Sequence, residues 1–170
     1  MTRDSWTSGV DRRTFLQRGA AAVATIAGVT GTAAAYHELE DDYETVVDVV
    51  DEGADPNGDE SITGVLEDLR EDDILVKFPD GRYYMDRKLR FTDFQNVGYV
   101  GKGDATLVPA NYHNFEGDSH KLFRLGTHYA PGTGLRVENF NVDFRGANTG
   151  VRAFEVSVTD DLTVDGVNVV

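Results

Sequence analysis

The stretch that decides the fold is LRVENFNV at residues 135–142, which recurs as LTVDGVNV at residues 162–169, 27 positions later. In each copy the apolar residues alternate, slip by one position at Asn139 or Gly166, and then alternate again. Alternation predicts a half-buried strand, because successive side chains on a strand point to opposite faces. A slip of one residue reverses the buried face unless the chain bends there. Asn and Gly tolerate the left-handed backbone of such a bend.

Other segments extend this pattern to a repeating unit. A weaker copy, FQNVGY at residues 94–99, places Asn96 at the bend, and a strand at 151–158 with a turn at 159–161 separates the two clear copies. One repeat thus holds three short strands in about 27 residues, which is typical of a β-solenoid. The last copy ends at Val170 without the polar cap that closes a solenoid. We expect a longer, C-terminally truncated solenoid; a partner that covers the open end is the alternative.

The first 35 residues have the layout of an export signal. The charged segment DRRTFL at residues 11–16 precedes a weakly apolar run at 19–29, and three alanines follow at 33–35. A charged start, a short apolar core and a small-residue cleavage site define such a signal, and the run is too short for a membrane span. We predict cleavage after Ala35; an amphipathic surface helix is the alternative.

The paired arginines in this segment resemble the twin-arginine (Tat) consensus. Arg12 and Arg13 are followed by Phe15 and Leu16 at the consensus spacing, while Asp and Gln occupy the first and last consensus positions. The resemblance implies export by the Tat translocase, to the medium or to the cell surface. The chain contains no cysteine, so no lipid anchor can be attached after cleavage and no disulfide supports the fold.

The composition is strongly acidic. The chain holds 30 Asp and Glu against 16 Lys and Arg, a formal net charge of −14, and residues 1–35 hold only two of the acidic residues. Such a surface repels nucleic acid and anionic lipid, and it disfavours anionic polymers unless bound cations or high salt intervene. We therefore expect no nucleic-acid partner. The acidity and the scarcity of lysine resemble proteins of extreme halophiles.

One amphipathic helix is predicted early in the chain. Four apolar residues spaced i, i+3, i+4 and i+7 form its buried face: Ile62, Val65, Leu66 and Leu69. Ser61 or Asp59 can cap its first turn. Before it, the acidic segment 36–45 is expected to be an extended, mobile leader. Short strands are predicted at residues 46–50, 74–78, 82–85, 88–91, 105–109 and 121–125.

The first part of this region resembles a known superfamily. VVDEGADPNGDESI at residues 49–62, the helix, FPDGRYY at 78–84 and Leu89 are similar to the N-terminal segment of the pectate-lyase-like superfamily. The resemblance covers about residues 46–108. It implies an all-β, right-handed parallel β-helix whose open N-terminal end is capped by the α-helix. The predicted organisation is a signal at 1–35, the acidic leader, and a β-helix domain from residue 46 to 170.

The resemblance also implies a function for the exported chain. Members of the superfamily act on extracellular polysaccharide as lyases or glycoside hydrolases, and the same solenoid serves in non-catalytic cell-surface or carbohydrate-binding modules. Both functions remain open from the sequence. A carboxylate pair on adjacent coils, at roughly 5–10 Å in a groove, discriminates the enzyme from the binding module.

Several outward-facing acidic residues are candidates for chemistry. Asp143 and Asp165 are the candidate acid/base carboxylates on neighbouring coils. Asp160 and Asp161 are candidate ligands for Ca²⁺, the metal that pectate lyases use, because carboxylate oxygens suit this ion. The alternative is a solvated acidic face, since the chain carries many carboxylates.

Aromatic and basic residues supply candidate contacts to a sugar. Tyr112, Phe115 and Tyr129 lie in predicted loops, and aromatic faces suit pyranose rings. Arg136 and Arg145 point outward on the first clear coil and complete the candidate substrate-binding set. The alternative is that the aromatic rings only cover the flank of the coil.

Three histidines lie in the same loops, His113, His120 and His128. Imidazole nitrogens bind zinc, but spacings of seven and eight residues match no familiar zinc motif. Solvated loop histidines are the alternative interpretation.

Overall fold

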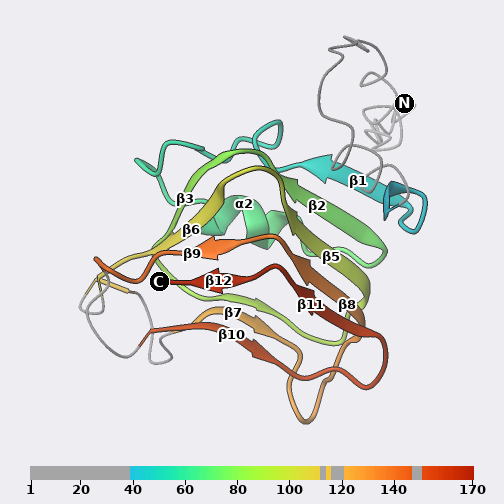
Figure 1. Cartoon of the computed structure of the whole chain (residues 1–170). Helices are drawn as coiled ribbons and strands as arrows, with labels where there is room; N and C mark the ends of the chain where they lie inside the picture. Colours follow the sequence, from blue (N-terminus) through green and yellow to red (C-terminus); the bar gives the residue numbers. More distant parts are fainter. Residues whose placement is uncertain (1–38, 112–113, 116–120, 147–150) are drawn as a thin grey trace, which may run out of the picture.

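The structure is a computed structural model that describes residues 39–111, 114–115, 121–146 and 151–170. The predicted export signal, including Arg12, Arg13, Phe15, Leu16 and Ala35, lies outside the described residues. Within the described part, parallel strands form a five-stranded sheet of order β1-β2-β5-β8-β11, a four-stranded sheet of order β12-β9-β6-β3 and a three-stranded sheet of order β10-β7-β4 (Figure 1). The fold is therefore mostly β with parallel sheets, in agreement with the predicted all-β class.

The chain visits the three sheets in rotation. The five-stranded sheet contains β1 (Thr45–Asp48), β2 (Ile74–Phe78), β5 (Gln95–Gly101), β8 (Thr133–Glu138) and β11 (Leu162–Asp165). The four-stranded sheet contains β3 (Gly81–Met85), β6 (Ala105–Pro109), β9 (Asn141–Val142) and β12 (Asn168–Val169). The three-stranded sheet contains β4 (Leu89–Phe91), β7 (Lys121–Leu125) and β10 (Arg152–Val156). Every predicted strand region holds a strand, with ends shifted by a few residues.

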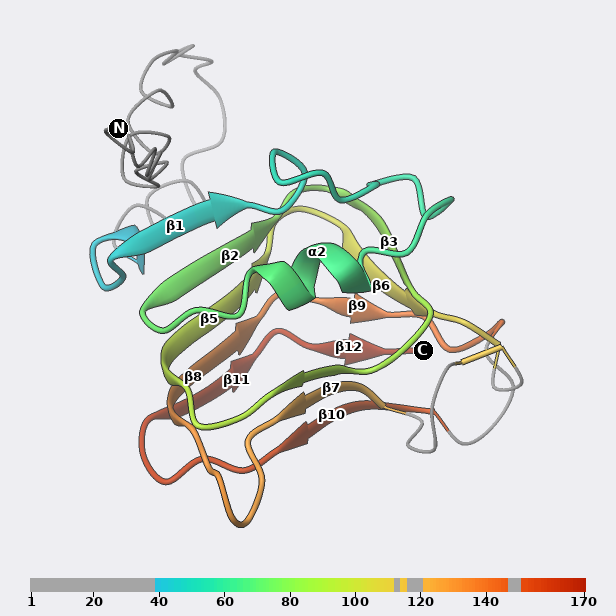
Figure 2. The ribbon, with the colours of Figure 1, turned by 180° about the vertical axis from the view of Figure 1, so that it is seen from behind.

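The two copies of the repeat lie side by side, as the 27-residue spacing predicts. Leu162 pairs with Leu135 and Val164 pairs with Val137 in the parallel register of β11 and β8 (Figure 2). Asn139 and Gly166 both have left-handed backbone angles, with φ of 59° and 61°. The predicted bend between the two strands of each copy is therefore confirmed.

The assignment of Asn96 to the same bend is wrong. Its φ is 49°, but β5 pairs Val97 with Leu135, so Asn96 stands beside Gly134, at the start of the strand rather than after it. Gly101 occupies the position beside Asn139, where a Cβ on Gly101 would lie 2.1 Å from the Asn139 carbonyl oxygen. The weaker copy therefore aligns with the other two in a different register from the predicted one. Left-handed residues occur at both ends of strands in this sheet, and the sequence comparison equated Asn96 at one end with Asn139 at the other.

The core lies between the three sheets. Inward residues of the five-stranded sheet such as Val97 and Val137 are buried against residues of the other two. Aromatic rings connect the layers: Phe78 makes edge contacts with Tyr83 at 5.3 Å and with Phe140 at 5.0 Å between ring centroids. With no cysteine in the chain, burial of such side chains supplies the main driving force for folding.

The helix α2 (Thr63–Asp68) packs across one end of this core (Figure 2). Ile62 and Leu66 are fully buried, and Val65 and Leu69 pack against the core, so the predicted apolar face is confirmed. The predicted cap is wrong. Ile62 is the N-cap and makes no side-chain cap hydrogen bond.

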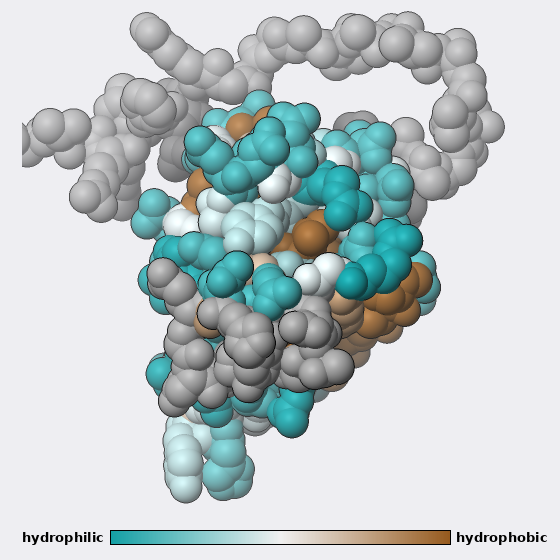
Figure 3. Space-filling view, turned by 90° about the vertical axis from the view of Figure 1, so that its left-hand side faces the viewer, coloured by the Kyte–Doolittle hydropathy of each residue, from teal (hydrophilic) through white to brown (hydrophobic). Residues whose placement is uncertain are grey.

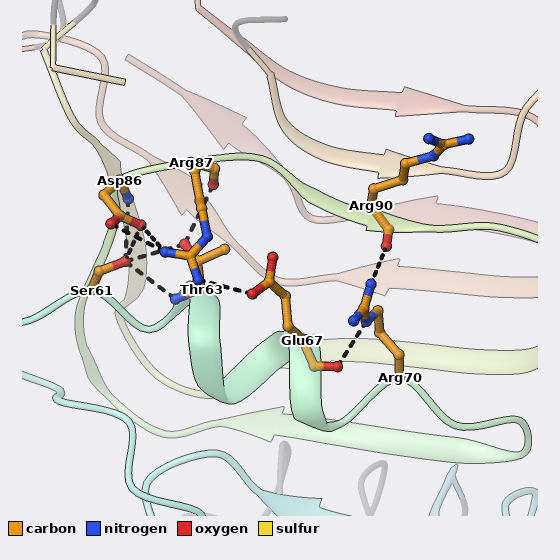
Figure 4. A network of polar contacts seen from close by, with 7 residues as sticks. All are labelled: Ser61, Thr63, Glu67, Arg70, Asp86, Arg87 and Arg90. Atoms are coloured by element: carbon orange, nitrogen blue, oxygen red, sulfur yellow. Dashed lines mark hydrogen bonds and ion pairs between the residues drawn. The ribbon is translucent and has the colours of Figure 1, made fainter. Parts of the chain in front are cut away.

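Polar contacts tie α2 to the connection between β3 and β4 (Figure 4). The Ser61 hydroxyl lies 2.5 Å from an Asp86 carboxylate oxygen and also accepts from the Thr63 amide. Arg87 bridges Asp86 and Glu67, at 3.1 and 2.8 Å. These contacts explain why Ser61 lies one residue before the cap position: its hydroxyl serves the tertiary network as well as the helix.

At the opposite end the last strands leave apolar side chains exposed. Leu162 and Val164 are 51% and 53% exposed, whereas their register partners Leu135 and Val137 are buried. No further described strand packs against them. The side of the molecule that faces left in Figure 1 is mainly hydrophilic, with smaller apolar areas (Figure 3). No described helix is long and apolar enough to cross a membrane.

Candidate ligand groove

A short segment before β1, residues 39–44, packs on the outer face of the five-stranded sheet, and we call it the strap. Glu40 forms an ion pair with Lys77 of β2 at 2.7 Å. The Asn96 side-chain amide donates to the Asp42 carbonyl oxygen at 2.9 Å. Most of the described part of the predicted leader is therefore fixed against the sheet, and Thr45, its last predicted residue, already belongs to β1.

The sheet presents an apolar strip beneath the strap. Leu75 and Val100 point away from the core, yet neither is exposed to solvent. Gly98 lies between them on this face, and a Cβ there would come within 2.7 Å of the Tyr43 hydroxyl oxygen and 2.6 Å of Leu75 Cδ1. A glycine is required at this position because the Tyr43 ring passes directly over the backbone of β5.

A groove of about 340 Å³ lies beside the strap. Its lining comes from the strap and from the residues that begin β5, β8 and β11: Asp42, Tyr43, Asn96, Gly134, Leu135, Arg136, Asp161, Leu162 and Thr163. The groove therefore crosses neighbouring strands of the sheet, a geometry that suits an extended ligand.

The groove owes its shape to a column of left-handed residues. Asp73 and Asp161 immediately precede β2 and β11, Asn96 and Gly134 are the second residues of β5 and β8, and all four have positive φ and stand in register. Asp and Asn adopt this backbone more readily than other non-glycine residues, and their side chains stack along the column. Gly134 has no side chain, so this position of the column adds no polar group between Asn96 and Asp161.

Hydrogen-bond acceptors dominate the groove. The Asp42 and Asp161 carboxylates have no ion-pair or hydrogen-bond donor among the described residues, and neither does the Asn96 carbonyl oxygen Oδ1. Arg136 is the only cation among the lining residues that the structure describes. A ligand that offers hydrogen-bond donors would therefore find partners here.

Arg136 is already committed to partners within the protein. Its guanidinium lies 2.6 Å from the Glu138 carboxylate and donates to the Tyr43 hydroxyl. Burial opposes the charge of Arg136, but the hydrogen bond and attraction to Glu138 outweigh it and raise its pKa. For Tyr43, in contrast, burial raises the pKa of the hydroxyl, and this effect is larger than the opposing effect of Arg136. The Tyr43–Arg136–Glu138 contact thus joins the strap to β8.

The groove brings together two predicted site residues, Arg136 and Asp161, that were assigned different roles. It also includes Asp42, Tyr43 and Asn96, which were not predicted as site residues. A sequence signal exists for Asn96, since Asp, Asn or Gly precedes the apolar run in four strands of this sheet, β2, β5, β8 and β11. The contribution of the strap has no such signal, because its contacts are with residues far away in sequence.

Asp143 lies on another part of the surface. It follows β9 and is 7% exposed, shielded by the side chains of Arg145, at 2.8 Å, and Arg82, at 3.4 Å. Hydrogen bonds from Arg145, together with its charge and a hydrogen bond from Arg82, hold the pKa of Asp143 far below its usual range. Both Arg145 and Asp143 are thereby occupied with each other.

Asp165 is separated from Asp143 and has another carboxylate beside it. In the parallel register of β11 and β8, Asp165 pairs with Glu138 on the outer face of the sheet. Paired residues on adjacent strands are about 4.8 Å apart. The carboxylate pair on neighbouring coils is therefore Glu138 and Asp165 rather than Asp143 and Asp165.

The calcium candidates, Asp160 and Asp161, are adjacent in the turn before β11. Asp160 accepts a hydrogen bond from the Asp161 amide at 3.1 Å. Among the described residues, no three His, Cys, Asp or Glu side chains gather where they could share a metal ion. Calcium takes about six to eight oxygen ligands. Asp160 and Asp161 with their described neighbours do not supply such a set.

The aromatic candidates fall in three different situations. Phe115 is 5% exposed and packs in the core, so its ring covers the coil flank, as the alternative interpretation proposed. Tyr129 is 94% exposed and makes an edge contact with the His128 ring, at 5.1 Å between centroids. Tyr112 lies outside the described residues, as do His113 and His120.

Comparisons with family models, with curated proteins and with solved structures found no match to this chain. The assignment of function therefore rests on the residues and geometry of the chain.

Proposed function

We propose that this protein is an exported right-handed parallel β-helix of the pectate-lyase-like type that binds an extracellular polysaccharide or cell-surface glycan. The rotation of the chain through three parallel sheets, the resemblance of residues 46–108 and the export signal support this proposal. Tat export, as the paired arginines imply, would deliver the protein to the compartment in which such polymers occur.

The groove beside the strap carries the proposal. Its volume of about 340 Å³ falls within the range of about 300–1,000 Å³ that is usual for ligand sites. It combines an aromatic wall, Tyr43, with carboxylate, amide and hydroxyl groups from three strands and the strap. Sugars are bound by this combination of an aromatic surface and convergent polar groups.

Filling the groove tests this assignment. In Gly134→Asn, a residue that tolerates left-handed backbone angles would place an amide between Asn96 and Asp161. Its Cβ would lie 3.1 Å from Asn96 Cα, so the neighbouring backbone has to move by a few tenths of an ångström. Gly53→Asn is the matched control, since Gly53 also has positive φ and has no atom within 4 Å of an added Cβ.

The measurement is binding of the mature protein to neutral, amino and acidic polysaccharides by affinity electrophoresis, at low and at high salt. We expect retardation by at least one polysaccharide, its loss in Gly134→Asn, and no loss in Gly53→Asn. Circular dichroism confirms the fold of both variants. Wild-type protein that binds none of the polysaccharides would refute the proposal, and unchanged binding in Gly134→Asn would refute this location.

Cleavage of the bound polymer is a second candidate function, which the register of Glu138 and Asp165 favours. Two carboxylates on adjacent strands are the arrangement that glycosidic hydrolysis uses. Release of reducing ends from the bound polysaccharide would be expected, and Asp165→Asn would abolish it without loss of binding. Absence of products with tightly bound substrate would leave binding as the function.

A further inference from the structure

We infer that the groove selects a glycan with protonated amino groups, an amino-sugar polymer, over a neutral or an acidic one. This inference rests on the proposed function and adds the chemical class of the ligand. It depends on the charges and unsatisfied hydrogen-bonding groups that line the groove.

The charge of the groove is negative. Asp42 and Asp161 contribute two carboxylates from opposite walls, the strap and the turn before β11. Arg136 contributes one positive charge, but Glu138 lies 2.6 Å from it and balances that charge locally. A uronic-acid polymer would therefore place its carboxylates against Asp42 and Asp161, and the net charge of −14 would add to the repulsion.

The hydrogen-bonding groups point to the same ligand class. Both protons of the Asn96 side-chain amide are used within the protein, toward the Asp42 carbonyl oxygen and the Asp73 carboxylate. Its Oδ1 accepts no hydrogen bond from the described residues, as is also true of the Asp161 carboxylate. An ammonium group donates three hydrogen bonds and accepts none, so it satisfies these acceptors better than a hydroxyl or a carboxylate does.

The groove that Gly134 lines provides the space for such a group. The column neighbours Asn96 and Asp161 stand on either side of Gly134, so a substituent entering there meets an amide oxygen and a carboxylate together. Tyr43 also lines this groove, and an aromatic ring suits the sugar that carries the ammonium. The geometry thus combines recognition of the charge with recognition of the ring.

The test compares oligomers that differ only in this group. Isothermal titration at about pH 5.5, where carboxylates of usual pKa about 3.9 are ionised, measures the affinity for glucosamine oligomers, N-acetylglucosamine oligomers, oligogalacturonate and spermine. The variant Asp42→Asn with Asp161→Asn removes the two charges. Asp51→Asn with Glu52→Gln is the control, because it makes the same change of net charge in the turn after β1.

We expect the wild-type protein to bind glucosamine oligomers about tenfold more tightly than their acetylated counterparts, as two surface ion pairs allow. Asp42→Asn with Asp161→Asn should remove this preference, and the control should preserve it. Raising salt from about 0.1 M to 1 M should reduce the preference, because the screening length falls from about 10 Å to 3 Å.

Each contrary result has a distinct meaning. Preference for oligogalacturonate, with or without added calcium, would overturn the inference while the proposed polysaccharide binding stands. Equal affinity for acetylated and deacetylated oligomers would do the same. Spermine that binds as tightly as the glucosamine oligomer would show recognition of charge without the sugar, which also overturns it. Failure to bind any of the glycans would refute the proposed function itself.

Discussion

The outer face of the five-stranded sheet differs between its first and last strands. On β2 and β5 it presents Leu75, Gly98 and Val100, all of which are buried, and Tyr43 of the strap lies over Gly98. On β11 it presents Thr163 and Asp165, which no described segment covers. The outward residues of these parallel strands therefore form a second, small core on one side of the groove and a polar surface on the other. Packing on both faces is what parallel strands usually require, and the strap provides it for β2 and β5.

The largest effect should come from removing the apolar contact beneath the strap. Leu75→Ala deletes a fully buried side chain, and such truncations cost about 2–5 kcal/mol of unfolding free energy. Thr163→Ala, at the neighbouring open strand, should change it by less than about 0.5 kcal/mol. Urea unfolding of both variants measures the difference. Equal small effects would mean that the strap does not hold Leu75 in a core.

A smaller loss of stability is expected when Gly98, which lies under the strap, is replaced by a residue with a side chain. Gly98→Ala places a methyl group 2.6 Å from Leu75 and 2.7 Å from the Tyr43 hydroxyl, and overpacking of this kind costs about 1–3 kcal/mol. Gly146→Ala is the control, because its Cβ meets no atom within 4 Å. Thermal unfolding compares the two. A stability of Gly98→Ala equal to that of Gly146→Ala would refute the close approach of Tyr43.

The hydrogen bond between Tyr43 of the strap and Arg136 of β8 should contribute less to the unfolding free energy than the apolar packing beneath the strap. Tyr43→Phe removes the hydroxyl that accepts from Arg136 and keeps the ring, so the loss should be about 0.5–1.5 kcal/mol. Urea unfolding measures the change, and Tyr84→Phe, on the half-buried outer side of β3, is a tyrosine control. A loss as large as that of Leu75→Ala would show that the hydrogen bond, rather than the apolar strip, fixes the strap.

The smallest effect concerns two carboxylates in contrasting surroundings. The folded-state pKa of Asp143 is lowered chiefly by hydrogen bonds from Arg145, so its stabilising contribution is present above the usual Asp pKa of about 3.9 and is lost as pH falls through the folded value. Asp143→Asn should therefore lower the melting temperature at pH 5.5 but much less at pH 2.5. Asp165→Asn, on the open strand, is the comparison, and the same pH-dependent change in both would refute the special role of Arg145.

Much of the fold could be predicted from local patterns. Alternation located the strands, and the slip at Asn139 and Gly166 located a bend, because these features depend on residues within one turn or strand. The apolar spacing around Leu66 located the helix for the same reason. Its cap was missed, since Ser61 is engaged by Asp86, which lies 25 residues later in the chain. The position of Asn96 was missed because the register depends on the neighbouring strand.

The candidate site was predicted less well than the fold. Arg136 and Asp161 were identified as outward-facing polar residues, which follows from strand alternation. Asp143 was identified on the same basis, yet Arg82 and Arg145 hold its carboxylate in ion pairs. Whether an outward carboxylate is available to a ligand depends on cations that the fold places beside it. Spacing along the chain contains no information on that pairing when the partner is 61 residues away, as Arg82 is.

The amino-acid sequence by itself determined the strands, their 27-residue repeat and the glycine and asparagine bends, because side-chain alternation and backbone preference act between near neighbours. Only the tertiary structure decided that the acidic segment before β1 packs over Gly98, and that Gly134 stands between Asn96 and Asp161. Both follow from the stacking of successive coils, which brings residues 23 to 54 positions apart into contact. The groove exists because this stacking places Gly134, which has no side chain, in line with Asn96 and Asp161.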